Sequence, residues 1–405
     1  MRLAGCTIAP HALLAQARVL IESFFAHAPD GHFYLLLVDG LPPTEALDPR
    51  VHLVEPSELP TDEYTALCFE YNAGELCAAL KPWFLFVLLS RYGERQVVFL
   101  DPELLILQPL DTLRQTLGAA NLVLTPNFVA PAPMHDGVSE DELLLRVGAF
   151  HPGVLGARAS DETTRCLGWW AERLRHGCHV DPARGLFLDQ KWLDLAPALF
   201  DGVAVLRDPA YHVTWANLYG RDLTEAGSQY RVNGQPLVCF RFSGLDPLDR
   251  QVRSASGHPL TPAPDAPLKR LIDGYAARCL DQGYLRLQRL PYPYASLDNG
   301  VPIHPLLRGL YGSLDDARRR AFGNPFVTAP PGSFWRWATA MRLDLHGLTP
   351  FLVHLHRARP DVAAVYPHLQ GEDRAAFVHW AQVHGVREHG YDPRLVALDY
   401  FENEG

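Results

Sequence analysis

A buried strand that ends in two carboxylates constrains this chain more than any other feature of its sequence. Residues 96–103 read QVVFLDPE, so an apolar run ends directly at Asp101, and Glu103 follows two positions later. Such a run is typical of a strand buried in a parallel sheet, where ligands bind at the carboxyl ends of the strands. Two carboxylates at this spacing can hold a hard divalent cation, which in turn binds the phosphates of a nucleotide. The alternative is a surface turn, which Asp-Pro commonly opens.

The N-terminal third alternates apolar runs with an amphipathic segment in the manner of βαβ units. Strands are predicted at residues 3–8, 33–38 and 51–54, and a helix at about residues 11–28. This alternation predicts a mostly parallel sheet covered by helices. The next expected helices are at residues 75–80 and 82–92, the second of which starts at Pro82. Two short strands are expected at residues 104–107 and 122–125.

The composition changes near residue 250. Residues 251–267 are rich in Pro, Ser and Gly and are the best candidate for a linker. Apolar residues then recur at helical spacing in three stretches, 268–279, 352–357 and 373–384. The 405 residues leave room for a large domain and a smaller one. We therefore expect an α/β domain over residues 1–250 and a mainly helical region over residues 251–405, which binds the acceptor or serves packing.

Charge, hydropathy and cysteine usage disfavour several partners and locations. The chain has 36 basic and 46 acidic residues, a net charge of −10 and no long basic run, so nucleic acid is not an expected partner. No apolar run reaches the roughly 20 residues of a membrane-spanning helix, and residues 1–8 do not resemble a signal peptide. The seven cysteines are scattered without a C-x-x-C pair, which indicates reduced thiols rather than a zinc site.

These observations predict a cytoplasmic protein without a transmembrane segment. Peripheral attachment to the inner face of the membrane, through a lipid-linked acceptor, stays open. The first strand is not followed by G-x-G-x-x-G, and the chain has no G-x-x-x-x-G-K-[ST], which disfavours dinucleotide oxidoreductases and P-loop NTPases.

Several segments, taken in order, resemble bacterial GT-A glycosyltransferases of the nucleotide-diphospho-sugar transferase superfamily. Lys81-Pro82-Trp83, followed by the strand that ends at Asp101 and Glu103, is similar to that family's lysine-proline helix start and strand-borne D-x-D. Three later blocks also resemble it: GLFLDQKW at 185–192, WANL at 215–218 and FRFSG at 240–244. The resemblance covers about residues 3–247 and rests on the order and spacing of the blocks rather than on any single motif.

The resemblance implies a GT-A fold, with a Rossmann-like, mostly parallel sheet, and a nucleotide-sugar donor bound with Mn or Mg. Asp101 and Glu103 would be the metal ligands that hold the diphosphate, with Lys81 as a phosphate partner. Thr7, on the first strand, and Asp39, at the end of the second, are assigned to the donor, whose base or ribose Asp39 could hydrogen-bond. Asp39 could instead simply form an Asp-Gly turn.

The resemblance also makes Asp189 the candidate catalytic residue, facing the sugar and the reacting centre, with Gln190 in the same pocket. Asp189 could orient donor hydroxyls, or act on the acceptor as a base or as a nucleophile-like stabiliser. The alternative is an N-cap for a helix that starts at Gln190. The Trp169-Trp170 pair is expected in the core of a helix, with sugar stacking as the weaker alternative.

Two departures from the family pattern leave the need for metal open. Glu103 is one methylene longer than the second aspartate of a D-x-D. Arg241 stands where the family usually has a histidine metal ligand, and arginine cannot ligate a metal. Arg241 could instead bind the diphosphate bidentately. His151 departs from an asparagine that the family often places in this block.

The first hypothesis is a glycosyltransferase that moves a sugar, a hexose or deoxyhexose, from a nucleotide-diphosphate donor to an acceptor hydroxyl in surface-glycan or glycolipid synthesis. The D-Q segment favours retention of configuration, by analogy only. The second is a non-catalytic module on a degenerate GT-A fold that binds a sugar nucleotide or a glycan. A nucleotidyltransferase ranks last, because no glycine- and lysine-rich loop follows the first strand.

Overall fold

The chain divides into two compact units. The first comprises residues 1–61 and 73–290, and the second comprises residues 62–72 and 291–405. The expected boundary at residue 250 therefore falls inside the first unit, because helix α9 (Pro267–Asp281) buries Leu271 and Ile272 in the same core as Leu35 of the sheet. The computed structural model describes residues 2–42, 44–132, 134–135, 138–139, 141–218, 220–227, 229–253, 259–260, 263 and 266–398.

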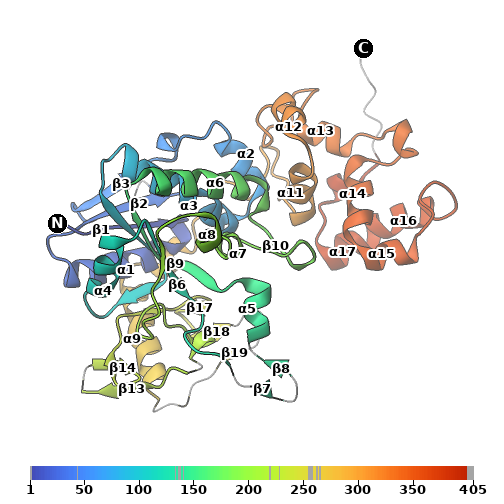
Figure 1. Cartoon of the computed structure of the whole chain (residues 1–405). Coiled ribbons are helices and arrows are strands. Elements are labelled where there is room, and N and C mark those ends of the chain that lie inside the picture. Colours follow the sequence, from blue (N-terminus) through green and yellow to red (C-terminus); the bar gives the residue numbers. More distant parts are fainter. Residues whose placement is uncertain are drawn as a thin grey trace. The chain divides into compact units, whose positions relative to one another are not determined.

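A seven-stranded sheet forms the centre of the first unit (Figure 1). Its strands are β1 (Ala4–Ala9), β2 (His32–Leu37), β3 (Val51–Val54), β4 (Gln96–Leu100), β6 (Leu122–Pro126), β9 (Phe150–Arg158) and β12 (Val203–Val205). They lie in the order β12-β6-β9-β4-β1-β2-β3. The pairs β1–β2, β1–β4, β2–β3 and β6–β12 are parallel, and only β9 runs antiparallel to its neighbours. The predicted α/β fold with a mostly parallel sheet is confirmed.

The order of these strands reverses at β1. From β1 the chain passes to β2 and β3 on one side, and it then returns to place β4 on the other side of β1. In open α/β sheets, the carboxyl ends of the strands at such a reversal flank the crevice where ligands bind. Asp101 directly follows β4, so the structure places it at this point.

Helices cover the sheet, and their bounds in the first unit are α1 (Leu14–His27), α3 (Ala73–Ser90), α4 (Asp111–Ala119), α5 (Asp141–Val147), α6 (Asp161–Gly177), α7 (Gln190–Leu193), α8 (Ala196–Leu199), α9 and α10 (Tyr284–Leu287). Side chains of α1 and α4 share a core with Val98 and Leu100 of β4. Phe99 points toward α3, where the Lys81 ammonium lies 4.5 Å from its ring centroid. Helix α3 packs along α6 (Figure 1).

The prediction of two helices separated at Pro82 is wrong, because α3 runs unbroken from Ala73 to Ser90 with Pro82 inside it. Proline cannot donate to the carbonyl four residues earlier, which weakens a helix. The helix continues because residues on both sides, such as Leu80 and Phe84, are fully buried and packing stabilises it. Among the described residues, α3 alone is long and apolar enough to cross a membrane by length and composition, and 56% of it is buried.

Smaller sheets extend the first unit. They are formed by β5 (Leu104–Ile106) with β16 (Cys239–Arg241), β7 (Met134–His135) with β8 (Val138–Ser139), β10 (Val180–Asp181) with β11 (Leu186–Phe187), β13 (Leu223–Ala226) with β14 (Gln229–Val232) and β15 (Gln235–Pro236), and β17 (Leu245–Asp246) with β18 (Gln251–Arg253) and β19 (Pro259–Leu260). Strands β18 and β19 lie within the expected linker. Residues 254–258, 261–262 and 264–265 of that linker lie outside the described residues.

The second unit is helical, as expected for the C-terminal region. Its helices are α2 (Tyr64–Glu70), α11 (Pro305–Gly312), α12 (Asp316–Phe322), α13 (Phe334–Thr339), α14 (Pro350–Ala358), α15 (Pro360–Val365), α16 (Arg374–Trp380), α17 (Val386–His389) and α18 (Pro393–Val396). Its core packs Phe69 of α2 against Tyr311 and Phe334 with edge-on ring contacts. Inside this core, Arg319 and Glu70 form a buried ion pair of 2.6 Å.

Gly5 in β1 tests the packing of the sheet against α1. A Cβ at this position would lie 2.7–2.8 Å from ring atoms of Phe24 and Phe33. We predict that Gly5→Ala lowers the free energy of unfolding by about 1–3 kcal/mol, because the two rings must move. Urea denaturation measures this change. Gly118→Ala, in helix α4 with no described atom within 4 Å, is the matched control and should be neutral or stabilising. Equal effects of the two substitutions would contradict the packing argument.

Candidate active site

Asp101 and Arg241 form an ion pair at the carboxyl end of β4. Arg241 Nε lies 3.0 Å from Asp101 Oδ2, and the two side chains are 17% and 16% exposed. Strand pairing produces this contact, because Arg241 on β16 lies opposite Leu104 on β5, three residues after Asp101. The other carboxylate oxygen of Asp101 accepts a hydrogen bond of 3.0 Å from the backbone N–H of Glu103. Both oxygens of Asp101 are therefore engaged within the protein.

Glu103 turns its carboxylate toward the segment that follows Arg241. Its backbone carbonyl accepts a hydrogen bond of 2.9 Å from the N–H of Phe242. Burial and the neighbouring Asp101 carboxylate raise the pKa of Glu103 to about 7, while Arg241, Gly244 and Ser243 act in the opposite direction. A carboxyl group with this pKa is partly protonated at neutral pH.

Two stacked histidines lie beside Arg241. His151 on β9 places Nε2 2.9 Å from Arg241 Nη1, and its Nδ1 lies 2.9 Å from the backbone nitrogen of Gly153. Burial and then Arg241 lower the pKa of His151, so its ring is neutral. A neutral imidazole has only one accepting nitrogen. Arg241 and Gly153 therefore compete for one acceptor.

The ring of His212 stacks on that of His151, with centroids 4.5 Å apart. His212 is fully buried, and neither of its ring nitrogens has a hydrogen-bond partner among the described residues. Its backbone has a φ of +48°, which is uncommon for a residue other than glycine. Unpaired buried nitrogens and a strained backbone in one residue are typical of functional sites rather than of packing alone.

Lys81 and Asp189 form a second, more buried ion pair. Lys81 Nζ lies 2.5 Å from Asp189 Oδ2, and the side chains are 9% and 6% exposed. The same ammonium lies 3.5 Å from the carbonyl oxygen of Pro152, the residue after His151. The structure thus brings together Lys81 and Asp189, which are 108 residues apart, and places them next to the His151 strand.

A hydrogen bond to the backbone of Asp189 and a turn at Leu188 fix the position of Asp189. The Trp170 indole donates a 3.1 Å hydrogen bond to the carbonyl oxygen of Asp189, which satisfies its N–H although the ring is buried in α6. Leu188 has a φ of +48°, so the chain turns sharply before Asp189. Asp189 precedes α7, but within the described chain its side chain makes no capping hydrogen bond. The carboxylate is directed to Lys81 rather than to the helix.

The other predicted donor residues have different surroundings. Asp39 contacts His11 through both oxygens, at 2.8 Å to its backbone nitrogen and 2.6 Å to Nδ1. Burial raises the pKa of Asp39, against the influence of His11. The Gln190 amide donates to the carbonyl oxygen of Val147 at 2.6 Å. Thr7 is fully buried, and its hydroxyl has no hydrogen-bond partner among the described residues.

The residues of this site do not fit a divalent cation. Over the described residues, no group of three or more His, Cys, Asp and Glu side chains is arranged to hold a metal ion. The Arg241 guanidinium lies 3.0 Å from Asp101 Oδ2, beside the carboxylate that would ligate the cation. A metal at Asp101 and Glu103 would therefore stand next to a fixed positive charge. In this arrangement the expected Mn or Mg site is not formed.

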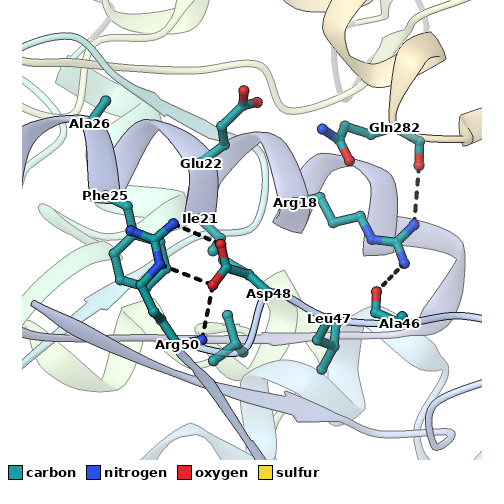
Figure 2. Close-up of a pocket in the computed structure, with 11 residues that line it drawn as sticks. Arg18, Ile21, Glu22, Phe25, Ala26, Ala46, Leu47, Asp48, Arg50 and Gln282 are labelled. Atoms are coloured by element: carbon teal, nitrogen blue, oxygen red, sulfur yellow. Dashed lines mark hydrogen bonds and ion pairs between the residues drawn. The ribbon is translucent and has the colours of Figure 1, made fainter. Parts of the chain in front are cut away.

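A pocket of about 570 Å³ lies elsewhere on the first unit, between α1 and residues 46–51 (Figure 2). None of the predicted site residues lines it. Its arginines already have partners: Arg50 pairs with Asp48 at 2.7 Å, and Arg18 donates to the Ala46 carbonyl at 2.8 Å. Figure 2 shows these groups bonded to one another rather than pointing into free space. The pocket is not the candidate active site.

One residue and two contacts of the site have no signal in the sequence. His212 is a single histidine without a motif, and only its burial and backbone conformation distinguish it. The bond from Trp170 to Asp189 and the ion pair of Lys81 with Asp189 join separate blocks. Such contacts follow from the tertiary fold, so block order alone could not predict them.

The structure of this chain is similar to solved structures of glycosyltransferases. No protein-family model matches the chain, and no curated protein matches its sequence. The galactosyltransferase LgtC, solved with donor and acceptor sugar analogs, is 15% identical with a TM-score of 0.39, and the match covers 68% of this chain and 95% of LgtC. GlyE of Streptococcus pneumoniae TIGR4 is 14% identical with a TM-score of 0.39, and the match covers 73% of this chain and 67% of GlyE. Mouse xyloside xylosyltransferase 1 is 14% identical with a TM-score of 0.34, and the match covers 60% of this chain and 97% of that enzyme. Identities and TM-scores this low leave the activity open.

The raised pKa of Glu103 predicts a pH effect on stability. The group titrates near 4.5 when unfolded and at about 7 when folded, so the folded state binds the proton more tightly between these values. The free energy of unfolding contributed by this group therefore falls as the pH rises from about 4.5 to 7. Glu103→Gln should lose this part of the dependence, so its melting temperature should fall less between pH 5 and 7.5. The exposed Glu372→Gln is the control. Parallel profiles for wild type and Glu103→Gln would refute the assignment.

The Lys81–Asp189 pair predicts strong coupling between two substitutions. Lys81→Met should lower the free energy of unfolding by about 3–5 kcal/mol, because it leaves a buried carboxylate without its counter-charge. Adding Asp189→Leu removes that charge and should recover most of the loss. A double-mutant cycle by urea denaturation measures the coupling. Additive effects of the two substitutions would show that the pair is not formed in solution.

Proposed function

We propose that this protein is a glycosyltransferase that moves a sugar from a nucleotide-diphosphate donor to an acceptor hydroxyl. The observation that carries the proposal is a line of contacts at the reversal of strand order. It runs from Asp101 to Arg241 and His151, and from Pro152 to Lys81 and Asp189. This line joins the blocks at Lys81, Asp101, Asp189 and Arg241, four of those that resemble GT-A enzymes, at the sheet edge where nucleotides bind in α/β folds.

Arg241 would bind the donor diphosphate. Its planar guanidinium can bind two phosphate oxygens at once, and its charge would stabilise the diphosphate as the glycosidic bond breaks. Since His151 accepts from either Arg241 or Gly153, the guanidinium can turn one N–H toward a ligand while it keeps its ion pair with Asp101. Asp101 would hold the arginine in place, and Glu103 would fix the following turn.

Asp189 would face the sugar, either orienting donor hydroxyls or acting at the reacting centre. Lys81 would act as a positioning residue rather than as the phosphate partner that the sequence suggested. Its ammonium holds one oxygen of Asp189, which leaves the other oxygen for the substrate. The buried setting strengthens this orientation, because the charges are poorly screened there.

The finer assignments are proposals as well. The transferred sugar would be a hexose or deoxyhexose, with retention of configuration. The acceptor would be a surface glycan or glycolipid, handled in the cytoplasm or at the inner face of the membrane. Thr7 would contribute its unpaired hydroxyl to the donor.

A non-catalytic module that binds sugar nucleotides or glycans is the second candidate. The observation that favours it is that Asp189 and Asp39 are each engaged with an internal cationic or histidine partner. Donor hydrolysis without acceptor, or transfer to any acceptor, would exclude this candidate.

Thermal melting against a panel of sugar nucleotides, with manganese or with a chelator, tests the donor site. A donor at about a hundred times its Kd adds roughly 2.7 kcal/mol and should raise the melting temperature by about 2–4 °C. We expect the same shift with and without metal. Arg241→Gln should remove it, whereas Arg207→Gln, an exposed arginine outside the site, should keep it. A shift that requires manganese would show that a metal ion, rather than Arg241, binds the diphosphate. No shift with any donor would refute the donor site.

Asp189→Asn separates binding from chemistry. The amide keeps the size of the side chain and can still accept from Lys81, but it removes the charge, so the fold should lose stability. Donor binding by the folded protein should be retained while transfer falls at least a hundredfold. Radiolabelled or coupled transfer assays with the stabilising donor measure this effect. Full activity of Asp189→Asn would defeat its catalytic assignment.

A further inference from the structure

The helical second unit has a pocket of about 310 Å³ among α11, α12, α13 and α14 (Figure 1 shows these helices). This volume lies at the lower end of the range for small-ligand sites, about 300–1,000 Å³. Its lining includes Arg318, Arg342 and Arg357, together with Trp337 and His354. None of these residues belongs to the candidate active site.

The charges of this pocket are not balanced. Asp344 is the only carboxylate in its lining, and it pairs with Arg342 at 3.0 Å. The side chains of Arg318 and Arg357 make no hydrogen bond or ion pair within the described part of the chain, and both residues are exposed. Burial and Arg357 lower the pKa of His354, so it adds no charge at neutral pH. The lining therefore has three arginines and one carboxylate, a net charge of +2, on a chain whose net charge is −10.

The structure also gives Arg318 and Arg357 defined places at the pocket. The Arg318 guanidinium lies over the Trp337 ring, 4.8 Å from its centroid, which restricts its motion. Arg357 projects from α14 on the same face as Val353 and His354, which also line the pocket. By contrast, each arginine in the pocket of Figure 2 is bonded to a neighbouring group.

We propose that this pocket binds a phosphate group, held by Arg318 and Arg357. Guanidinium groups bind phosphate oxygens bidentately, and a phosphomonoester carries nearly two negative charges at neutral pH, which match those of the pocket. Leu310, Leu345 and Val353 give the lining an apolar part for the group that carries the phosphate. The site does not depend on the proposed transferase activity.

Two sources can present this chemistry, a soluble sugar phosphate or the phosphate of a lipid. Leu343 is 94% exposed on the loop that carries Arg342 and Asp344, so an apolar side chain stands next to the pocket. The shared ligand is the phosphate, and the experiment below separates its sources.

The test uses the full chain in phosphate-free buffer. Calorimetric titration with inorganic phosphate and with glucose 1-phosphate probes the soluble source. Sedimentation with phosphatidylcholine vesicles, with and without phosphatidic acid, probes the lipid source. We expect one of these phosphate-bearing probes to bind, and Arg318→Gln and Arg357→Gln each to weaken it about tenfold, since each removes a charge-assisted contact.

Arg387→Gln is the matched control, because Arg387 is an exposed arginine of the same unit that lies outside the pocket lining. It should leave binding unchanged. Should Arg318→Gln fail to fold, Arg357→Gln alone tests the site, because the Arg357 side chain makes no hydrogen bond or ion pair among the described residues. Binding of none of the probes would overturn the proposal. A loss with Arg387→Gln as large as with the pocket variants would overturn it too, because it would indicate general charge attraction.

Discussion

The pairing of β9 with β4 is the constraint on which the candidate site depends. β9 enters the sheet antiparallel between β4 and β6, and the backbone N–H of Asp101 donates to the Gly153 carbonyl at 2.7 Å. This bond places His151 and Pro152 beside the carboxyl end of β4. Both ion pairs of the site then contact this short segment, Arg241 through the His151 ring and Lys81 through the Pro152 carbonyl.

The crowding around Gly153 shows how closely these parts fit. A Cβ there would lie 2.8 Å from His151 Nδ1 and 3.3 Å from His212 Nε2. The absence of a side chain at this one position lets two imidazole rings stack next to the backbone of the sheet. A side chain at Gly153 would therefore displace the rings of His151 and His212.

Local pattern was enough to predict most of the sheet, because buried strands are short apolar runs that carry their own signal. The segment at Val51–Val54 and the strand ending at Leu100 match the prediction. The pattern failed at Pro82, where tertiary burial outweighs a local helix breaker, and at residue 250, where α9 returns to the core of the first unit. In the candidate site, the sequence supplied candidate residues but could not predict which of them contact one another. Lys81 was expected at a phosphate, yet it contacts Asp189, because only the fold decides which charges meet.

The fixed guanidinium at the end of β4 has a consequence for how such a site would respond to its surroundings. A bound metal ion exchanges with the medium, competes with other metals and is removed by chelators. An arginine is attached covalently and stays charged at every pH at which the protein is folded. The affinity of an anionic substrate at Arg241 would therefore follow ionic strength, and the supply of manganese or magnesium in the cell would not control it.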